Sequence, residues 1–310
     1  MGARELLEAQ LLQEQSLGFF TDFYVEAGRL DQAKPSYRFG NDHSLFDLAS
    51  LTKALATGPL VHAFTRSQSL PRSAELNQWA PGTWQSNFSS ELMKLSAEAL
   101  LSHRSGLPAW RNFWMGHLNE GPAPQPQLKN PLIVETFARL NALGSPEDLY
   151  SDLGYILLGF ALEAATGQRL DQLWASHLQS FLIKPADLGF GTQMTSPANA
   201  FIPSATCAVR ERLLQGEVHD ENCAALGGVA GHAGLFGRGA TVGIYLRALA
   251  HSIEGLAYLE SNEACLKAHA YEGLSGMRRG AGSSAALFAA GAGMGHLGFT
   301  GTAFWLDLPS

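Results

Sequence analysis

Apolar and polar positions follow two different spacings along this chain. Near both ends the pattern is typical of strands. Residues 19–28 are rich in aromatic side chains, residues 35–40 can return beside them after a turn, and Thr302–Leu308 is again aromatic and aliphatic. Between these ends, apolar residues recur at the three- and four-residue spacing of helices. The pattern therefore predicts one sheet built from both ends of the chain and interrupted by a helical block.

The helical spacing is clear enough to place individual helices. We predict them at residues 1–18, 50–67, 96–101, 131–143, 153–165, 170–182 and 241–253. Residues 121–131 contain four prolines and predict a loop instead.

Three of these helices carry further expectations. The first is amphipathic, and its leucines gather on one side: Leu6, Leu7, Leu11 and Leu12. The helix at 153–165 is almost entirely apolar and ends at Gly167, so we expect it to be buried. Gly58-Pro59 falls inside the second helix and predicts a kink or a break, because proline removes a backbone donor.

Composition narrows the classes of partner. The chain is 46% hydrophobic and 16% charged, which is ample material for a core. Its formal charge of −7 and the lack of a Lys/Arg run argue against nucleic acid and anionic membrane surfaces. The sequence contains no stretch of about eighteen apolar residues, so it predicts no membrane-spanning helix. The three cysteines, an odd number at wide spacing, indicate reduced thiols: Cys207, Cys223 and Cys265.

The first eighteen residues also bear on the compartment. They contain scattered glutamates and lack the apolar core of a signal peptide. As written, the chain is expected in the cytoplasm. A signal removed beforehand would make it periplasmic or secreted.

The candidate chemistry starts at Ser50, because Lys53 follows three residues later among good helix formers. Residues three apart share one helix face, so Ser50 Oγ and Lys53 Nζ are expected to meet. A serine hydroxyl needs an adjacent base, and an amine desolvated among apolar neighbours loses part of its preference for the charged form. The pair is a candidate nucleophile and base, although many helices carry this spacing by chance.

A second candidate is Tyr150-Ser151-Asp152, directly before the predicted buried helix. On a loop at the mouth of that helix, Tyr150 could pass a proton between a nucleophile and a leaving group. Ser151 or Asp152 fits the role of helix N-cap equally well. The two interpretations are compatible, because a cap fixes the loop that aims Tyr150.

A third candidate segment starts at His296, at the opening of the last strand. Gly298 would allow a substrate to lie against the strand edge, and His296 could donate to a carboxylate or a carbonyl. A histidine between glycines is also common as an ordinary turn residue. His103 is expected instead to brace a turn before Gly106.

Two further patterns are weighed against metals and cofactors. His219, Asp220 and Glu221 with His232 offer ligand types, but their spacing matches no zinc motif such as His-Glu-x-x-His. We therefore expect no metal and a loop packed near the site. The glycine-rich runs around 227–231 and 291–295 lack the pattern of dinucleotide or phosphate loops, so no cofactor is expected.

Taken together, five segments resemble the class C β-lactamase-related serine hydrolases in order and spacing: residues 46–57, 100–108, 150–159, 216–236 and 295–302. That superfamily includes penicillin-binding D,D-peptidases, class C β-lactamases and many esterases. A Ser-x-x-Lys motif with two partner motifs is typical of related enzymes.

The resemblance implies an α/β fold of the α+β type, in which an antiparallel sheet is flanked by helices and carries an inserted, mostly helical lobe. It implies a single catalytic domain over residues 1–310, with the sheet at about 1–45 and 285–310 and the lobe at about 68–225. The family normally continues with further strands and a helix, which we expect to be missing after Leu308.

The resemblance also implies roles for individual residues. Ser50 would be the acylated nucleophile and Lys53 its base or proton relay. Tyr150 would share the general-base work and help deacylation. The N–H groups of Ser50 and Phe299 would form the oxyanion hole.

Two residues depart from the family pattern, and with Gly298 and Phe299 they complete the predicted substrate-binding set. Asp152 stands where many members have asparagine, so an amide donor is lacking there. His296 replaces the lysine of a Lys-Thr-Gly pattern, and a mostly neutral histidine lacks the permanent cation that binds a substrate carboxylate. This favours an esterase-like or D,D-peptidase-like enzyme over an efficient β-lactamase.

We therefore expect a serine hydrolase that acts on a small-molecule or peptide substrate. It would cleave an ester or an amide, such as a β-lactam or a D-Ala-type peptide, through an acyl-Ser50 intermediate. The alternative is a catalytically silent binding or scaffold protein on the same fold. The intact set of Ser50, Lys53 and Tyr150 argues against that alternative.

Overall fold

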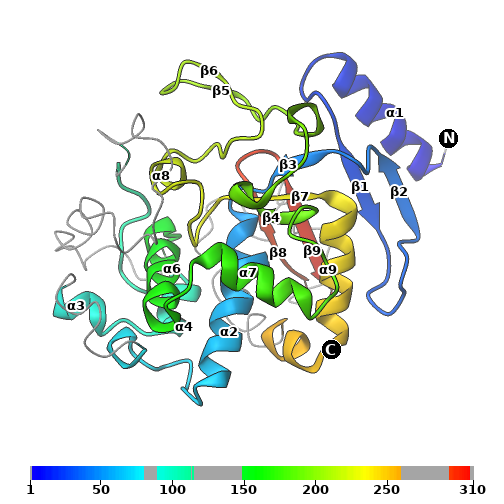
Figure 1. The fold of residues 1–310 in the computed structure, drawn as a ribbon. Helices are drawn as coiled ribbons and strands as arrows, with labels where there is room; N and C mark the ends of the chain where they lie inside the picture. The colour runs from blue at the N-terminus through cyan, green and yellow to red at the C-terminus, as the bar shows by residue number, and fades with distance from the viewer. Residues whose placement is uncertain (1, 80–88, 113, 115–148, 260–292, 308–310) are drawn as a thin grey trace.

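The computed structural model describes residues 2–79, 89–112, 114, 149–259 and 293–307 of the 310-residue chain. Helices and short strands alternate along these residues (Figure 1). The predicted helix at 131–143 and loop at 121–131 lie outside the described residues, as does Cys265.

A three-stranded sheet holds the segment that leads to Ser50. Its order is β3 (Leu45–Asp47), β7 (Leu235–Arg238) and β4 (Leu188–Phe190), and both ladders are antiparallel. Nearly all of its residues are buried. The sequence pattern did not predict these strands, because three or four consecutive buried residues show no period of two.

Three further pairs of strands are antiparallel hairpins. They are β1 with β2 (Tyr24–Ala27 and Tyr37–Gly40), β5 with β6 (Thr206–Cys207 and Arg212–Leu213), and β8 with β9 (Gly293–Leu297 and Ala303–Asp307). The strands predicted near both ends are therefore present, but among the described residues β1–β2 and β8–β9 are separate two-stranded sheets and not parts of one sheet built from both ends. The last of them is a hairpin rather than a single strand, because a turn at 298–302 reverses the chain.

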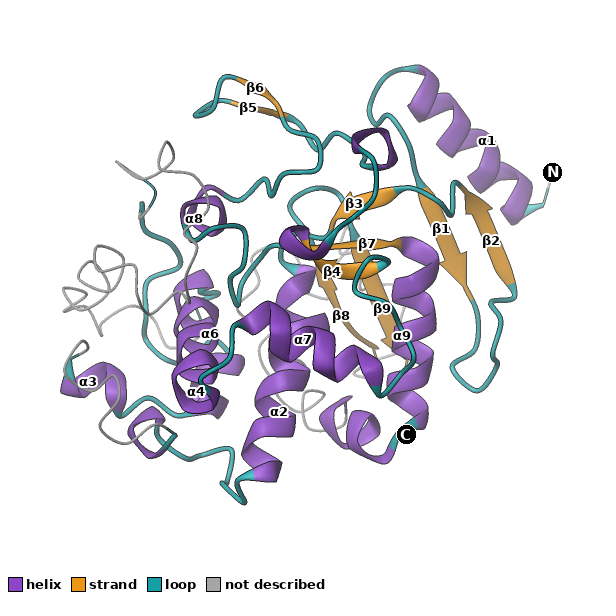
Figure 2. Cartoon of the chain, in the orientation of Figure 1, coloured by secondary structure: helices purple, strands orange, loops and turns teal. Residues whose placement is uncertain are grey.

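The helices flank these strands, as Figure 2 shows. They are α1 (Ala3–Ser16), α2 (Gly58–Ser67), α3 (Ser90–Met93), α4 (Ala97–Leu101), α6 (Asp152–Thr166), α7 (Leu170–Gln179), α8 (Glu221–Ala225) and α9 (Gly239–His251). α9 lies against β1 and β7, whereas α6 contacts α2, α4 and α7. Helices around antiparallel strands confirm the predicted fold class.

α6 forms the apolar centre of the helical group. Its residues 153–163 are all buried, as their apolar composition predicted. The helix begins after Ser151, whose hydroxyl accepts the N–H of Gly154 at 3.3 Å, and it ends at Gly167 in the left-handed conformation. Both boundaries follow from the sequence.

α1 forms where predicted, but it is not covered. None of its residues is buried, and Leu6 and Leu12 are each 52% exposed. No helix in the described ranges is long and apolar enough to cross a bilayer. Cys207 and Cys223 are buried free thiols.

The backbone of the segment after α8 lies directly against the backbone of α6. One glycine on each side, Gly231 in the segment and Gly159 in α6, makes this close contact possible. A methyl group at Gly231 would collide with the carbonyl oxygen of Tyr155, and one at Gly159 would lie 3.0 Å from the Gly231 nitrogen. Across this segment, the Thr57 hydroxyl donates to the Gly231 carbonyl at 2.6 Å. The contact holds the chain before β7 between α6 and the helix that follows Ser50.

We expect Gly231→Ala to lower the free energy of unfolding by about 3 kcal/mol, since only a backbone shift can relieve the collision. Urea unfolding at pH 7 measures the loss. Gly167→Ala is the matched control, because its methyl group meets nothing within 4 Å and only the left-handed backbone opposes it, at about 1 kcal/mol. Equal losses in the two variants would contradict the packing argument.

Candidate active site

Ser50 lies where the chain leaves β3 and enters a helix. Helical hydrogen bonding starts at Leu51, so the serine precedes the first turn. Ala49 has a φ of 45°, a left-handed conformation that is uncommon for a residue with a side chain. The Asp47 carboxylate accepts the N–H of Ala49 at 2.8 Å and supports that turn. The strained backbone at Ala49 therefore places the Ser50 hydroxyl at the end of β3.

The helix after Ser50 contains a π-helical turn at Lys53–Thr57, which continues into α2. The predicted kink or break at Gly58-Pro59 takes this form instead. Pro59 lies in the first turn of α2, where a missing N–H removes little hydrogen bonding. The chain therefore stays helical past the proline.

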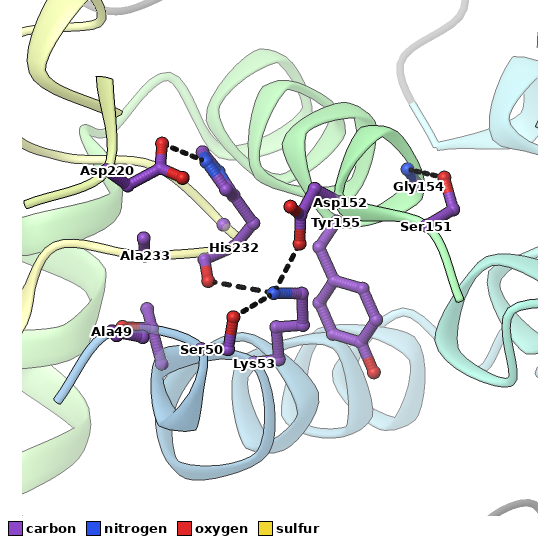
Figure 3. Close-up of polar contacts among 12 residues, drawn as sticks. Ala49, Ser50, Lys53, Ser151, Asp152, Gly154, Tyr155, Asp220, His232 and Ala233 are labelled. Carbon is purple, nitrogen blue, oxygen red and sulfur yellow. Dashed lines mark hydrogen bonds and ion pairs between the residues drawn. The ribbon is translucent and has the colours of Figure 1, made fainter. Parts of the chain in front are cut away.

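The Lys53 ammonium lies between three acceptors from three segments (Figure 3). Nζ is 2.9 Å from Ser50 Oγ, 3.1 Å from the His232 carbonyl oxygen and 2.7 Å from Asp152 Oδ1. The lysine side chain is only 1% exposed, and that of Asp152 is 19% exposed. The predicted contact between Ser50 and Lys53 is present, and Asp152 joins it as the ion-pair partner.

The charge on Lys53 differs from the expectation that desolvation would weaken it. Burial alone would lower the pKa of Lys53, but the Asp152 carboxylate, with a further contribution from Tyr150, raises the pKa above its usual value. Lys53 is therefore an ammonium near neutral pH. The expectation was wrong because it considered apolar neighbours and omitted a carboxylate 99 residues away in the sequence.

Tyr150 completes the group around the serine. Its hydroxyl is hydrogen-bonded to Lys53 and Ser50, and its ring lies 5.0 Å from Lys53 Nζ. Burial raises the pKa of Tyr150, and the nearby ammonium only partly offsets this. The phenol is therefore neutral, and it can give a proton to a leaving group more readily than it can take one.

The loop that carries Tyr150 is fixed on both sides. The Ser151 hydroxyl, which caps α6, donates to the Pro108 carbonyl at 2.7 Å. The Ser151 N–H donates to His103 Nδ1 at 3.0 Å, and the His103 ring lies 4.4 Å from that of Tyr150. His103 was predicted to brace a turn before Gly106. In the structure it braces the Tyr150 loop.

His296 is buried in β8 beside this group. Its ring centroid is 6.0 Å from that of Tyr150. Burial lowers the pKa of His296 to about 4, so the ring is neutral at pH 7. Nδ1 lies 2.8 Å from the Leu297 carbonyl oxygen, a contact that needs the ring proton on Nδ1. Nε2 then accepts, so the neutral ring cannot donate to a substrate carboxylate as predicted.

The turn after His296 lies against the segment that precedes Ser50. The hydroxyls of Thr300 and Thr302 donate to the carbonyls of Asp47 and Leu48, at 2.6 and 3.3 Å. A methyl group on Gly298 would clash with Thr302 and approach the Leu48 carbonyl, so the lack of a side chain permits this contact.

The backbone N–H groups assigned to the oxyanion hole are free to act. Among the described residues, no hydrogen bond uses the N–H of Ser50 or of Phe299. The Phe299 side chain is 83% exposed. Because its turn lies against the residues before Ser50, the two N–H groups belong to touching segments.

Asp47 is a site residue that sequence reasoning missed. Besides Ala49, its carboxylate accepts the N–H of His219 at 2.7 Å, and burial raises its pKa to about 6. The signal in the sequence is slight: one aspartate in an apolar run, three residues before Ser50.

The residues weighed as metal ligands belong to two separate contacts. His232 Nε2 lies 2.8 Å from Asp220 Oδ1, which also caps α8, whereas His219 Nδ1 lies 2.9 Å from Ser204 Oγ. Burial would raise the pKa of Asp220, but His232 lowers it to about 2. In the described part of the chain, no three such side chains gather as metal ligands do. The loop instead reaches the site through the His232 carbonyl.

Comparison with known families agrees with this arrangement. The family model described as Beta-lactamase matches residues 30–309, nearly the whole chain. The chain belongs to the beta-lactamase family. The expected family relationship is thereby confirmed.

Curated relatives of this beta-lactamase family member are longer proteins. An N-acetylmuramyl-L-alanine amidase of Bacillus subtilis (strain 168) is 28% identical over 224 residues, which cover 66% of this chain and 50% of the relative. An Escherichia coli (strain K12) protein named for D-alanyl-D-alanine carboxypeptidase activity is 27% identical over 226 residues, with the same coverage. The chain spans about half the length of the curated relatives it matches.

Solved structures share the fold at low identity. EstCE1, described as a hydrolase with promiscuous acyltransferase activity, is 15% identical with a TM-score of 0.62, and the match covers 96% of this chain and 88% of that one. The octameric penicillin-binding protein homologue from Pyrococcus abyssi is 14% identical with a TM-score of 0.61, covering 84% and 60%. At these identities the likeness shows the fold alone.

We expect His296→Gln to weaken the dependence of stability on acid. The pKa of His296 is about 4 when folded and 6.5 otherwise, so the unfolded chain binds more protons and stability falls as pH drops from 6.5 to 4. Relative to the wild type, the variant should gain about 3 kcal/mol between pH 7.5 and pH 4 in urea unfolding. His177→Gln is a positive control and should give the same pH dependence, because burial also lowers the pKa of His177 to about 4. A difference from wild type that stays constant with pH would contradict a neutral, buried His296.

We expect Lys53→Met to destabilise the fold by about 2 kcal/mol, because it leaves the Asp152 carboxylate without its partner. Adding Asp152→Asn to that variant should restore most of the loss, as a double-mutant cycle by urea unfolding would measure. Since the pKa of Lys53 is raised, the coupling is present below the unfolded value of 10.5 and should not change between pH 7 and 9. Additive losses would show that the pair contributes nothing.

Proposed function

We propose that this chain is a serine hydrolase that cleaves an ester or an amide through an acyl-Ser50 intermediate. The observation that carries the proposal is the 2.9 Å contact between Lys53 Nζ and Ser50 Oγ, with the Tyr150 hydroxyl bonded to both. A nucleophile, a proton carrier and a proton donor thus share one site. The family relationship and the hydrolase named among the structural neighbours support the same reaction class.

The charge on Lys53 shapes the first step. An ammonium cannot accept the serine proton unless it gives one away. As the Ser50 proton moves to Nζ, one Nζ proton moves to Asp152 Oδ1, 2.7 Å away. The Ser50 oxygen then bonds to the carbonyl carbon, and the developing oxyanion lies toward the N–H groups of Ser50 and Phe299. Lys53 therefore works as a relay, one of its two expected roles.

The neutral phenol of Tyr150 acts when the leaving group departs. Tyr150 gives its proton to the leaving alcohol or amine, so that the group departs uncharged. The ester bond to Ser50 remains as the acyl-enzyme. Lys53 then returns a proton to the Tyr150 phenolate and takes back the proton held by Asp152. Water attacks the ester while one of its protons moves to the same relay, and that proton finally passes to the departing Ser50 oxygen, which regenerates the serine.

We expect hydrolysis of a short-chain 4-nitrophenyl ester, and we expect Ser50→Ala to lower kcat at least about 1,000-fold, because removal of the nucleophile closes the acyl-enzyme route. Release of nitrophenol by the purified protein measures both rates. The Ser50→Ala variant should still unfold in one cooperative urea transition, at a somewhat lower urea concentration than the wild type because Lys53 Nζ loses one acceptor. Turnover that persists in a folded Ser50→Ala variant would overturn the acyl-serine mechanism.

A further inference from the structure

Asp152 places a negative charge beside the reacting serine and lysine. This carboxylate and the Ser50 hydroxyl contact the same nitrogen, Lys53 Nζ, at 2.7 and 2.9 Å. The carboxylate therefore lies within two hydrogen-bond lengths of the reacting oxygen. A positive and a negative charge this close largely cancel for any group that approaches Ser50.

His296 adds no positive charge beside this pair. The ring is buried in β8, and its proton is committed to the Leu297 carbonyl through Nδ1. Nε2 is left as an acceptor, which repels a carboxylate oxygen and can accept from a hydroxyl or an amide N–H. The geometry thus opposes an anionic group from the side of His296 as well.

Other charges near the site do not replace the missing cation. Asp220 is a second carboxylate within electrostatic range of Lys53, held by His232. The Arg210 guanidinium is bound by the carbonyls of Val218 and His219, at 2.9 and 2.5 Å. Within the described residues, the charges around Ser50 therefore sum to no positive surplus.

We infer that Asp152 is a specificity-determining residue, which makes the site accept uncharged acyl groups and discriminate against acyl groups that carry a carboxylate. The inference rests on the proposed function and refines its substrate class. Binding a carboxylate would cost its hydration, and a neutralised Lys53 with an acceptor at His296 does not compensate for that loss. Uncharged esters and amides lose much less on entering.

Two esters of equal length test this inference: 4-nitrophenyl hexanoate and the mono-4-nitrophenyl ester of adipic acid, which differ by one terminal carboxylate. We expect the wild type to prefer the hexanoate by at least about tenfold in kcat/KM. Asp152→Asn exposes the charge of Lys53 and should raise the adipate-to-hexanoate ratio about tenfold. His296→Lys adds a cation and should move the ratio in the same direction. Asp187→Asn, which removes a carboxylate paired with Arg238, is the matched control and should leave the ratio unchanged.

The readout is a ratio, so it does not depend on how much activity a variant keeps. Where turnover by Asp152→Asn is too slow, calorimetric affinities for phenylboronic acid and 3-carboxyphenylboronic acid give the same comparison. A Ser50-dependent wild type that prefers the adipate ester, or an Asp152→Asn ratio equal to that of the wild type, would overturn this inference alone. No hydrolysis of either ester above the Ser50→Ala background would overturn the proposed function, and this inference with it.

Discussion

The buried ammonium of Lys53 is the constraint on which the site depends. A charge in the interior is stable only when each of its N–H bonds meets an acceptor. Here the acceptors come from the turn before the π-helical segment, from the N-terminus of α6 and from the loop before β7. Each of these segments has its own anchor: Asp47 for the turn, the Ser151 cap for α6, and Gly231 against α6 for the loop. The charge and the packing therefore require one another.

Local features of this site could be predicted from the sequence. The three-residue spacing of Ser50 and Lys53, the cap at Ser151 and the apolar run of α6 all depend on neighbours within one or two helical turns. The same is true of the β1–β2 hairpin. The helix after Ser50 was also expected, but the form of its irregularity was not. Gly58-Pro59 indicates that the helix is irregular and does not indicate that the irregularity is a π-helical turn.

Features that depend on distant residues could not be predicted. The central strands are too short and too buried to show a period, and they are defined by pairing across nearly two hundred residues, as between Leu45 and Arg238. The protonation of Lys53 depends on Asp152, and the acceptor role of His296 Nε2 depends on the direction of its Nδ1. Residue types propose chemistry in these cases, but only the folded geometry decides the charge and the direction of each hydrogen bond.

The turn between β8 and β9 contacts a segment from near the start of the chain, and this bears on the order in which the site forms during folding. Thr300 binds the Asp47 carbonyl across 253 residues of sequence, so the two proposed oxyanion donors come together only when this long loop closes. Contacts of such separation form late in folding. A partly folded chain can already hold Ser50 beside Lys53, but it lacks the second donor. Catalytic competence should therefore appear as one of the last events of folding, after the nucleophile itself is in place.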